Sequence, residues 1–271
     1  MARQRLGQHF LADAGWREEI ARAIRVSPQS VAPSLSRDDR CWIEIGAGHG
    51  EMTEHLASTG AAVCAIELDA RLAAGLQRLA KRFPNLTVVS ADVLETNIAA
   101  LTGGRRVRIY GNLPYYITSP ILHHLFASAE LIDEIHIVVQ HEVALRLAGH
   151  PGTRDYGYLS VLTQYFSRPE LVLDIPRDAF RPPPEVSSAL VTLRFPGERA
   201  KLPRINEDSF LEFVKLCFSQ KRKTLVNNLK SRVKPELIRE ALTRLNLRVD
   251  ARAEQLSVAN LAALFQQAQP A

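Results

Sequence analysis

The sequence predicts an α/β domain with a doubly wound parallel sheet, followed by a small all-helical domain. In the first two-thirds of the 271 residues, short β-branched runs alternate with amphipathic helical patterns, which is typical of βα units. After a segment rich in Pro, Gly and mixed charges, the pattern becomes entirely helical. We therefore expect one domain over residues 1–196 and a second over 197–271.

The expected sheet is built from evenly spaced apolar runs. The runs that predict its parallel strands are 41–46, 62–68, 86–92, 107–112 and 134–140. Residues 71–82 form the clearest helix, since Leu72, Leu76 and Leu79 recur at helical spacing. Two further runs, 171–175 and 189–195, flank a proline-rich segment. We expect them to form an antiparallel pair that closes the sheet, with the proline run as a stiff extended connection.

The second domain is predicted to be helical and basic. Its expected helices are 210–218, 224–229, 236–245 and 258–265, and Pro235 is suitably placed to begin one of them. Residues 1–195 hold 20 Lys and Arg against 21 Asp and Glu, whereas residues 196–271 hold 14 against 8. This asymmetry indicates a polyanionic partner, and the alternative is an ordinary solvated surface.

Composition excludes several classes of protein. Hydrophobic residues make up 46% and charged residues 23%, as in ordinary globular proteins. No apolar run approaches the length of a membrane helix, and the first residues lack a signal-peptide pattern, so we expect a cytoplasmic protein without a membrane partner. The three cysteines are scattered and the eight histidines show no ligand spacing, so we expect neither disulfides nor a metal site. No feature demands a dimer, so we expect a monomer.

A glycine-rich turn follows the first expected strand of the sheet. In Trp42-Ile-Glu-Ile-Gly-Ala-Gly-His-Gly50 the glycines are spaced G-x-G-x-G, and Glu51 occupies the third glycine position of a dinucleotide fingerprint. A glutamate at a helix start repels a pyrophosphate, which disfavours a nicotinamide cofactor. A cofactor without phosphate, such as S-adenosylmethionine, meets no such penalty. The alternative is a turn that needs glycine only for its backbone conformation.

Acidic residues end the next two expected strands. Glu67 is suited to accept the hydroxyls of a ribose, and Asp92 to read an adenine amino group. Both lie where ligands bind in open α/β sheets, at the carboxyl ends of parallel strands. Taken singly, each could be a loop residue or a helix cap.

The fourth expected strand ends in the most specific motif of the chain, Asn112-Leu113-Pro114-Tyr115. Methyl transfer to an exocyclic adenine amine is difficult, because the nitrogen lone pair is delocalised into the ring. The Asn112 side-chain oxygen and the Leu113 carbonyl are suited to hold the amino hydrogens, and Pro114 stiffens the turn. Tyr115 can stack on the base. Such a mechanism depends on geometry more than on a strong base.

The sequence resembles the bacterial small-subunit ribosomal RNA adenine N6-dimethyltransferases, the KsgA (RsmA) family. The matching segments are Gly7-Gln-His-Phe-Leu11, Glu44-Ile-Gly-Ala-Gly-His-Gly50, Glu67-Leu-Asp69, Ala91-Asp92, Asn112-Leu-Pro-Tyr115, Gln140-His-Glu-Val-Ala144, Tyr156-Gly-Tyr-Leu-Ser160, 180–187 and Phe218-Ser-Gln-Lys-Arg-Lys-Thr-Leu225. The resemblance implies a Rossmann-like S-adenosylmethionine-dependent methyltransferase domain. It also implies dimethylation of two adjacent adenines in a hairpin loop near the 3′ end of 16S rRNA, within the small ribosomal subunit (30S precursor).

The resemblance also implies roles for individual residues. The residues that it places beside the cofactor are His9, Leu11, Gly46, Glu67, Asp92 and Asn112. His9 stands where Asn is usual in the family, and Ala47 where Pro is usual. Phe180 is expected to sandwich the target base opposite Tyr115, the alternative being a core phenylalanine at the sheet edge.

The densest basic cluster is Lys221, Arg222 and Lys223, which we expect to contact RNA phosphates; a solvated helix face is the alternative. Two other functions remain open at this point. One is the macrolide-resistance methyltransferase group, which modifies large-subunit rRNA. The other is an RNA-binding assembly factor or transcription accessory protein whose catalysis is vestigial.

Overall fold

The chain folds into two compact units. A computed structural model describes residues 9–25 and 41–268. The first unit comprises Met1–Ala144 and Glu170–Phe195, and the second comprises Leu145–Pro169 and Pro196–Ala271.

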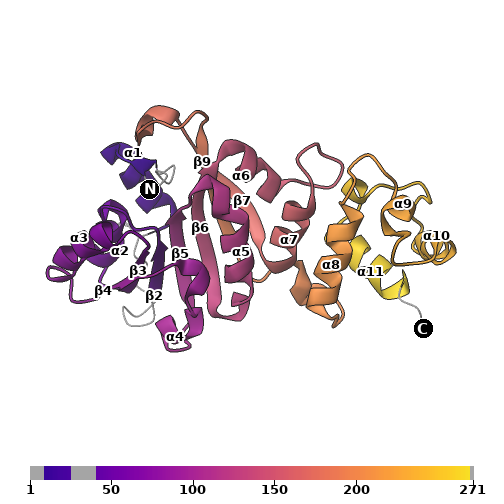
Figure 1. The fold of residues 1–271 in the computed structure, drawn as a ribbon, viewed down its shortest axis with the longest axis horizontal. Helices are drawn as coiled ribbons and strands as arrows, with labels where there is room; N and C mark the ends of the chain where they lie inside the picture. The colour runs from indigo at the N-terminus through magenta and orange to yellow at the C-terminus, as the bar shows by residue number, and fades with distance from the viewer. Residues whose placement is uncertain (1–8, 26–40, 269–271) are drawn as a thin grey trace, which may run out of the picture. The chain divides into compact units, whose positions relative to one another are not determined.

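The first unit is built on the expected sheet (Figure 1). Seven strands lie in the order β4-β3-β2-β5-β6-β9-β7. Neighbouring strands from β4 to β6 run parallel, and β9 runs antiparallel to β6. The strand bounds are β1 Phe10–Leu11, β2 Cys41–Ile45, β3 Ala62–Glu67, β4 Leu86–Ser90, β5 Val107–Asn112, β6 Ile132–Gln140, β7 Arg168–Ile175, β8 Phe180–Arg181 and β9 Ser188–Arg194. The structure thus confirms the predicted Rossmann-like sheet, including the last two strands at its far edge.

The helix bounds in the two units together are α1 Ala14–Ala23, α2 Glu51–Ser58, α3 Ala70–Ala80, α4 Ile98–Thr102, α5 Thr118–Phe126, α6 His141–Ala148, α7 Tyr158–Phe166, α8 Glu207–Cys217, α9 Leu225–Leu229, α10 Pro235–Arg244 and α11 Val258–Ala268.

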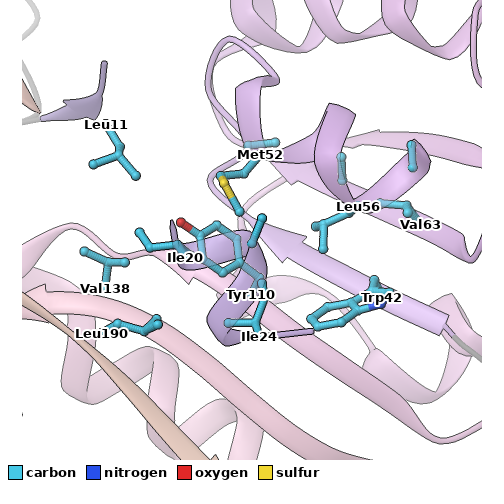
Figure 2. Close-up of a cluster of buried hydrophobic side chains, with 14 of the residues drawn as sticks. Leu11, Ile20, Ile24, Trp42, Met52, Leu56, Val63, Tyr110, Val138 and Leu190 are labelled. Atoms are coloured by element: carbon cyan, nitrogen blue, oxygen red, sulfur yellow. The ribbon is translucent and has the colours of Figure 1, made fainter. Parts of the chain in front are cut away.

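Helices of the first unit cover both faces of its sheet, because both faces are apolar. Trp42 and Tyr110 belong to a cluster that includes side chains of α1 and α2. Figure 2 shows Met52 reaching from α2 toward the Tyr110 ring on β5. Ile43, which points to the opposite face, is also fully buried.

A small ribbon that the sequence does not predict joins distant parts of the first unit. β1 pairs antiparallel with β8, and the partners are Phe10 with Arg181 and Leu11 with Phe180. The proline-rich connection therefore contains a strand rather than only an extended coil. The ribbon brings the segment before α1 against the connection between β7 and β9.

The second unit is helical, but it is larger than the sequence predicts. The expected boundary after residue 196 lies one residue from the observed division, yet the unit also takes in Leu145–Pro169. Long-range contacts of this segment explain its place. The Tyr156 hydroxyl donates to the Leu256 carbonyl at 2.8 Å, and the Tyr165 ring lies 5.1 Å from that of Phe210.

One glycine in the second unit is tightly enclosed. The Gly197 N–H donates to the Phe166 carbonyl at 2.8 Å. A Cβ atom at Gly197 would lie 2.3 Å from the Ser167 nitrogen and 2.5 Å from the Gln164 oxygen. These neighbours are backbone atoms, so they cannot turn away as a flexible side chain can.

We therefore expect Gly197→Ala to lower the free energy of unfolding by at least about 2 kcal/mol, through overpacking. The matched control is Gly157→Ala in the same unit, because a Cβ there meets nothing within 4 Å. Urea denaturation of both variants measures the difference. Equal stabilities would contradict the packing described here.

Candidate active site

The four expected strand ends lie side by side at one edge of the sheet. Gly46 follows β2, Glu67 is the last residue of β3, Asp92 follows β4 and Asn112 ends β5. Because β4, β3, β2 and β5 are consecutive parallel neighbours, their carboxyl ends meet at the same edge. The structure thus brings these four residues to the place where open α/β sheets bind ligands.

The turn after β2 requires glycine at three positions. Gly46, Gly48 and Gly50 have φ of 70°, 59° and 91°, in the left-handed region that other residues rarely adopt. A Cβ at Gly48 would also lie 3.1 Å from the Phe10 ring. The glycine spacing seen in the sequence therefore reflects both backbone conformation and the close approach of β1.

Glu67 braces this turn from the neighbouring strand. Its Oε2 accepts the Gly48 N–H at 2.8 Å, and its Oε1 accepts the Asp69 N–H at 2.9 Å. The side chain is buried, with 2% of its surface exposed. The carboxylate is thus oriented by two backbone donors, and each oxygen retains a second lone pair for a ligand. The sequence did not reveal this bracing role.

Asp92 has a local structural contact as well. Its Oδ1 accepts the Leu94 N–H at 2.9 Å and caps a 3-10 turn, Val93–Glu95. The side chain is half-buried rather than covered. The cap fixes the carboxylate at the end of β4, where the sequence predicts a contact to the cofactor.

Asn112 is held by a residue far away in the sequence. Its Nδ2 donates to the His9 carbonyl at 2.9 Å, and the His9 Nδ1–H donates to the Pro182 carbonyl at 2.8 Å. One of the two N–H groups of the Asn112 amide is used in this bond, which fixes the orientation of the amide. Oδ1 is the acceptor that the amide can offer to a substrate.

The turn after Asn112 is braced on both sides. The Leu113 N–H donates to the Val138 carbonyl at 3.1 Å, and the Leu113 side chain is buried. Pro114 has φ −59°, and its carbonyl accepts the Ile117 N–H at 3.2 Å. The backbone of Tyr115 begins a 3-10 turn, but its side chain lies outside the described part of the structure.

Phe180 and Leu11 lie in the core rather than at the surface of the site. Phe180 is fully buried and Leu11 is 7% exposed, and the two are partners in the β1–β8 ribbon. They belong to the same cluster as Ile20 and Tyr110. A fully covered ring cannot stack on a base in this conformation, so the structure matches the alternative of a core phenylalanine, and stacking by Phe180 stays a prediction. A stacking role would require the ribbon to move.

A buried carboxyl lies beneath the glycine turn, and sequence analysis missed it. Glu44 in β2 is 2% exposed, and Tyr110 is its register partner on β5. Within the described residues, Glu44 Oε2 and the Tyr110 hydroxyl have no hydrogen-bond partner. Burial, reinforced by the Glu51 and Glu67 carboxylates, raises the pKa of Glu44 to about 8. The available signal was an acid inside a strand whose other side chains are all apolar.

These residues fit a cationic cofactor that carries no phosphate. Glu51 and Glu54 lie in the first turn of α2, where a phosphate would otherwise bind. Glu67, Asp92 and the unpartnered Glu44 oxygen add acceptors at or below the same edge. S-adenosylmethionine, with its sulfonium and ammonium groups, matches this set of acceptors, whereas a pyrophosphate does not.

The basic cluster lies in the second unit. Lys221, Arg222 and Lys223 are exposed in the turn before α9. The Lys221 Nζ donates to the Arg154 carbonyl at 2.6 Å, which orients the side chain without neutralising it. Exposed cations on an ordered turn are suited to phosphate contacts.

No helix in the described part of the chain is long and apolar enough to cross a membrane. Over the same residues, the structure has no cluster of three or more His, Cys, Asp or Glu side chains that could hold a metal ion.

Comparison with known proteins gives a family match over nearly the whole chain. The family model described as "Ribosomal RNA adenine dimethylase" matches residues 1–269. A "Ribosomal RNA small subunit methyltransferase A" from Koribacter versatilis is 38% identical over 274 residues, covering 96% of this chain and 92% of the relative. The protein of the same name from Acidobacterium capsulatum is 39% identical, covering 96% and 89%.

Solved structures share the fold. A dimethyladenosine transferase from Plasmodium falciparum has a TM-score of 0.79 at 24% identity, covering 94% of this chain and 96% of the other. The 23S rRNA methyltransferase ErmE has a TM-score of 0.70 at 26% identity, covering 96% and 99%.

Proposed function

This chain belongs to the ribosomal RNA adenine dimethylase family, and we propose that it dimethylates N6 of two adjacent adenines in a hairpin loop near the 3′ end of 16S rRNA. S-adenosylmethionine is the cofactor, and it supplies the methyl group when bound. The substrate is the small ribosomal subunit during its assembly, the 30S precursor. The protein acts as a monomer in the cytoplasm.

The observation that carries this proposal is the orientation of the Asn112 amide. The His9 carbonyl accepts from its Nδ2, so Oδ1 is the acceptor turned to the substrate. Oδ1 and the Leu113 carbonyl hold the two hydrogens of the adenine amine. This arrangement favours a tetrahedral nitrogen whose lone pair points at the methyl group. Pro114 keeps the two oxygens in place, and Tyr115 stacks on the base.

The remaining residues position the cofactor. The turn of Gly46, braced by Glu67, would hold S-adenosylmethionine together with the Glu67 and Asp92 carboxylates, which would accept hydrogen bonds from its ribose and its adenine. His9 and Leu11 form the wall contributed by β1. Stacking by Phe180 stays a prediction, which requires the ribbon to open.

Lys221, Arg222 and Lys223 bind phosphates of the RNA and position it without reading its sequence. We expect the replacement of all three residues by Gln to weaken RNA binding. The slope of log Kd against the logarithm of the salt concentration should fall by about 0.7 for each phosphate that the cluster no longer neutralises. Cofactor affinity should not change. Filter binding at several salt concentrations and calorimetry with S-adenosylmethionine measure the two quantities.

The control removes three cations elsewhere in the same unit. The residues replaced by Gln in the control are Lys215, Arg239 and Arg244, each of which is paired with a glutamate of its own helix. The control variant loses three positive charges, the same change in net charge as in the triple variant of the cluster. If both triple variants lose RNA affinity to the same degree, the effect is one of net charge and the assignment of the cluster is wrong.

A comparison between ribosomal subunits tests the substrate. Unmodified small and large subunits are incubated separately with the protein and methyl-labelled S-adenosylmethionine. Label in the small subunit alone supports the proposal. Label in the large subunit would assign the protein to the activity named for ErmE, and no label with intact cofactor binding would indicate an assembly factor.

A further inference from the structure

Two arginines line a hollow on the connection between β7 and β9. The cavity has a volume of about 520 Å³, and none of the side chains that line it belongs to the strand-end site. The residues that line it are Pro176, Arg177, Asp178, Arg181, Pro183 and Ser187. It belongs to the first unit, which also carries the strand-end site.

Both guanidinium groups are oriented by backbone carbonyls. The Arg177 Nε donates to the Pro184 carbonyl at 2.8 Å. The Arg181 Nη1 donates to the carbonyls of Asp178 and Phe180, both at 2.9 Å. A carbonyl fixes a guanidinium without cancelling its charge. Each group therefore keeps both its full charge and its other N–H donors.

The charge of these arginines is not neutralised by ion pairing. In the described part of the chain neither forms an ion pair, in contrast to Arg194, which pairs with Glu134 and Glu170. Asp178 contributes one carboxylate to the lining, so two cations face one anion. The excess charge is positive, and a planar guanidinium matches a phosphate through two parallel hydrogen bonds.

The hollow is connected to the catalytic amide through the ribbon. Arg181 is the strand partner of Phe10, and the next residue, Pro182, accepts from His9. His9 in turn holds the Asn112 amide through its carbonyl. A ligand at the arginines therefore sits on the same small structural element that orients Asn112.

We propose that Arg177 and Arg181 bind a backbone phosphate of the substrate RNA next to the target adenine. The inference rests on the proposed function, because the anion comes from the RNA: S-adenosylmethionine carries no phosphate. The contact stabilises the bound RNA equally before and during methyl transfer, so it contributes to affinity rather than to kcat. It is distinct from the phosphate contacts of the basic cluster Lys221, Arg222 and Lys223 in the second unit.

The first test replaces both arginines by Gln. The double variant should raise KM for the RNA roughly 10-fold, as expected for charge-assisted hydrogen bonds, and leave kcat at saturating RNA within about twofold of wild type. The salt slope should fall by about 0.7 for each phosphate that is no longer neutralised, while cofactor Kd stays the same. The control removes two exposed cations of the α3 region, as Arg78→Gln with Lys81→Gln, and should change none of these.

A second test uses the wild-type protein and does not depend on how the variant folds. The probe is a synthetic RNA hairpin in which one phosphodiester at a time is a neutral methylphosphonate. Wild-type affinity should fall at one or two linkages beside the target adenines, and the double variant should be insensitive at those linkages. A variant with Lys at both positions keeps the positive charge but loses the planar guanidinium that can form two parallel hydrogen bonds. Its sensitivity to the neutral linkages should lie between that of wild type and that of the double Gln variant.

The outcomes separate the two claims. If wild type methylates small subunits but its affinity is insensitive to every linkage beside the adenines, the phosphate site is wrong and the proposed function stands. The same holds if the double variant keeps wild-type KM and salt slope. If wild type transfers no methyl group to RNA at all, the proposed function itself fails.

Discussion

Replacement of Asn112 by Ala is expected to lower kcat roughly 10²–10³-fold, the usual cost of removing one oriented polar group that acts in the transition state. The variant loses the Oδ1 acceptor and leaves the His9 carbonyl without its donor. Because the acceptor acts on the reacting nitrogen, the loss should appear in kcat at saturating RNA. Single-turnover methyl transfer to unmodified small subunits measures it.

Two further variants show whether the effect is specific. Asn97→Ala removes another asparagine of the first unit, whose Oδ1 caps α4, so it should cost stability but not kcat. Asn112→Asp keeps an acceptor oxygen but places a carboxylate against the His9 carbonyl, so we expect partial activity. Full methyl transfer by Asn112→Ala would remove Asn112 from the mechanism.

Replacement of Glu44 by Gln is expected to stabilise the protein in a pH-dependent way. The pKa of the Glu44 carboxyl is raised to about 8 by burial, above its value in the unfolded chain. The contribution of this carboxyl to the free energy of unfolding is complete at a pH below the pKa that the group has in the unfolded chain. That contribution is lost as the pH rises toward 8, the pKa of the group in the folded protein. Between pH 5 and 8 the loss is on the order of 3 kcal/mol.

Gln has nearly the same shape and does not ionise, so the variant should escape that loss. The free energy of unfolding of wild type and Glu44→Gln should be close at pH 5 and diverge by about 3 kcal/mol at pH 8 in favour of the variant. Denaturant titrations of wild type and variant at both pH values measure this difference. Because the two proteins share every other titratable group, the difference reports on the Glu44 carboxyl alone. A difference that does not depend on pH would show that Glu44 is not protonated in the fold.

The sheet and its strand-end residues were predictable because their signals are local. Apolar runs at regular spacing placed the strands, and a parallel sheet brings strand ends together whatever the helices do. The glycine turn and Asn112 therefore appear in the sequence where they appear in the structure.

The rest depends on contacts between distant residues. The β1–β8 ribbon joins segments at opposite ends of the first unit through only two residue pairs, Phe10 with Arg181 and Leu11 with Phe180. Neither segment has an alternation of apolar and polar residues long enough to predict that the two segments pair. For the same reason local patterns could not decide between the two positions expected for Phe180, and they could not group Leu145–Pro169 with the second unit.

The measurement that tests the central claim most directly is the identity of the methylated nucleoside. Unmodified small subunits are incubated with wild-type protein and methyl-labelled S-adenosylmethionine, and the 16S rRNA is digested and mapped by mass spectrometry. The oriented Asn112 amide predicts methylation of the exocyclic amine of adenine, and the proposed function predicts N6,N6-dimethyladenosine at two adjacent positions near the 3′ end. Label on any other base, or on a ring nitrogen rather than the exocyclic amine, would contradict it.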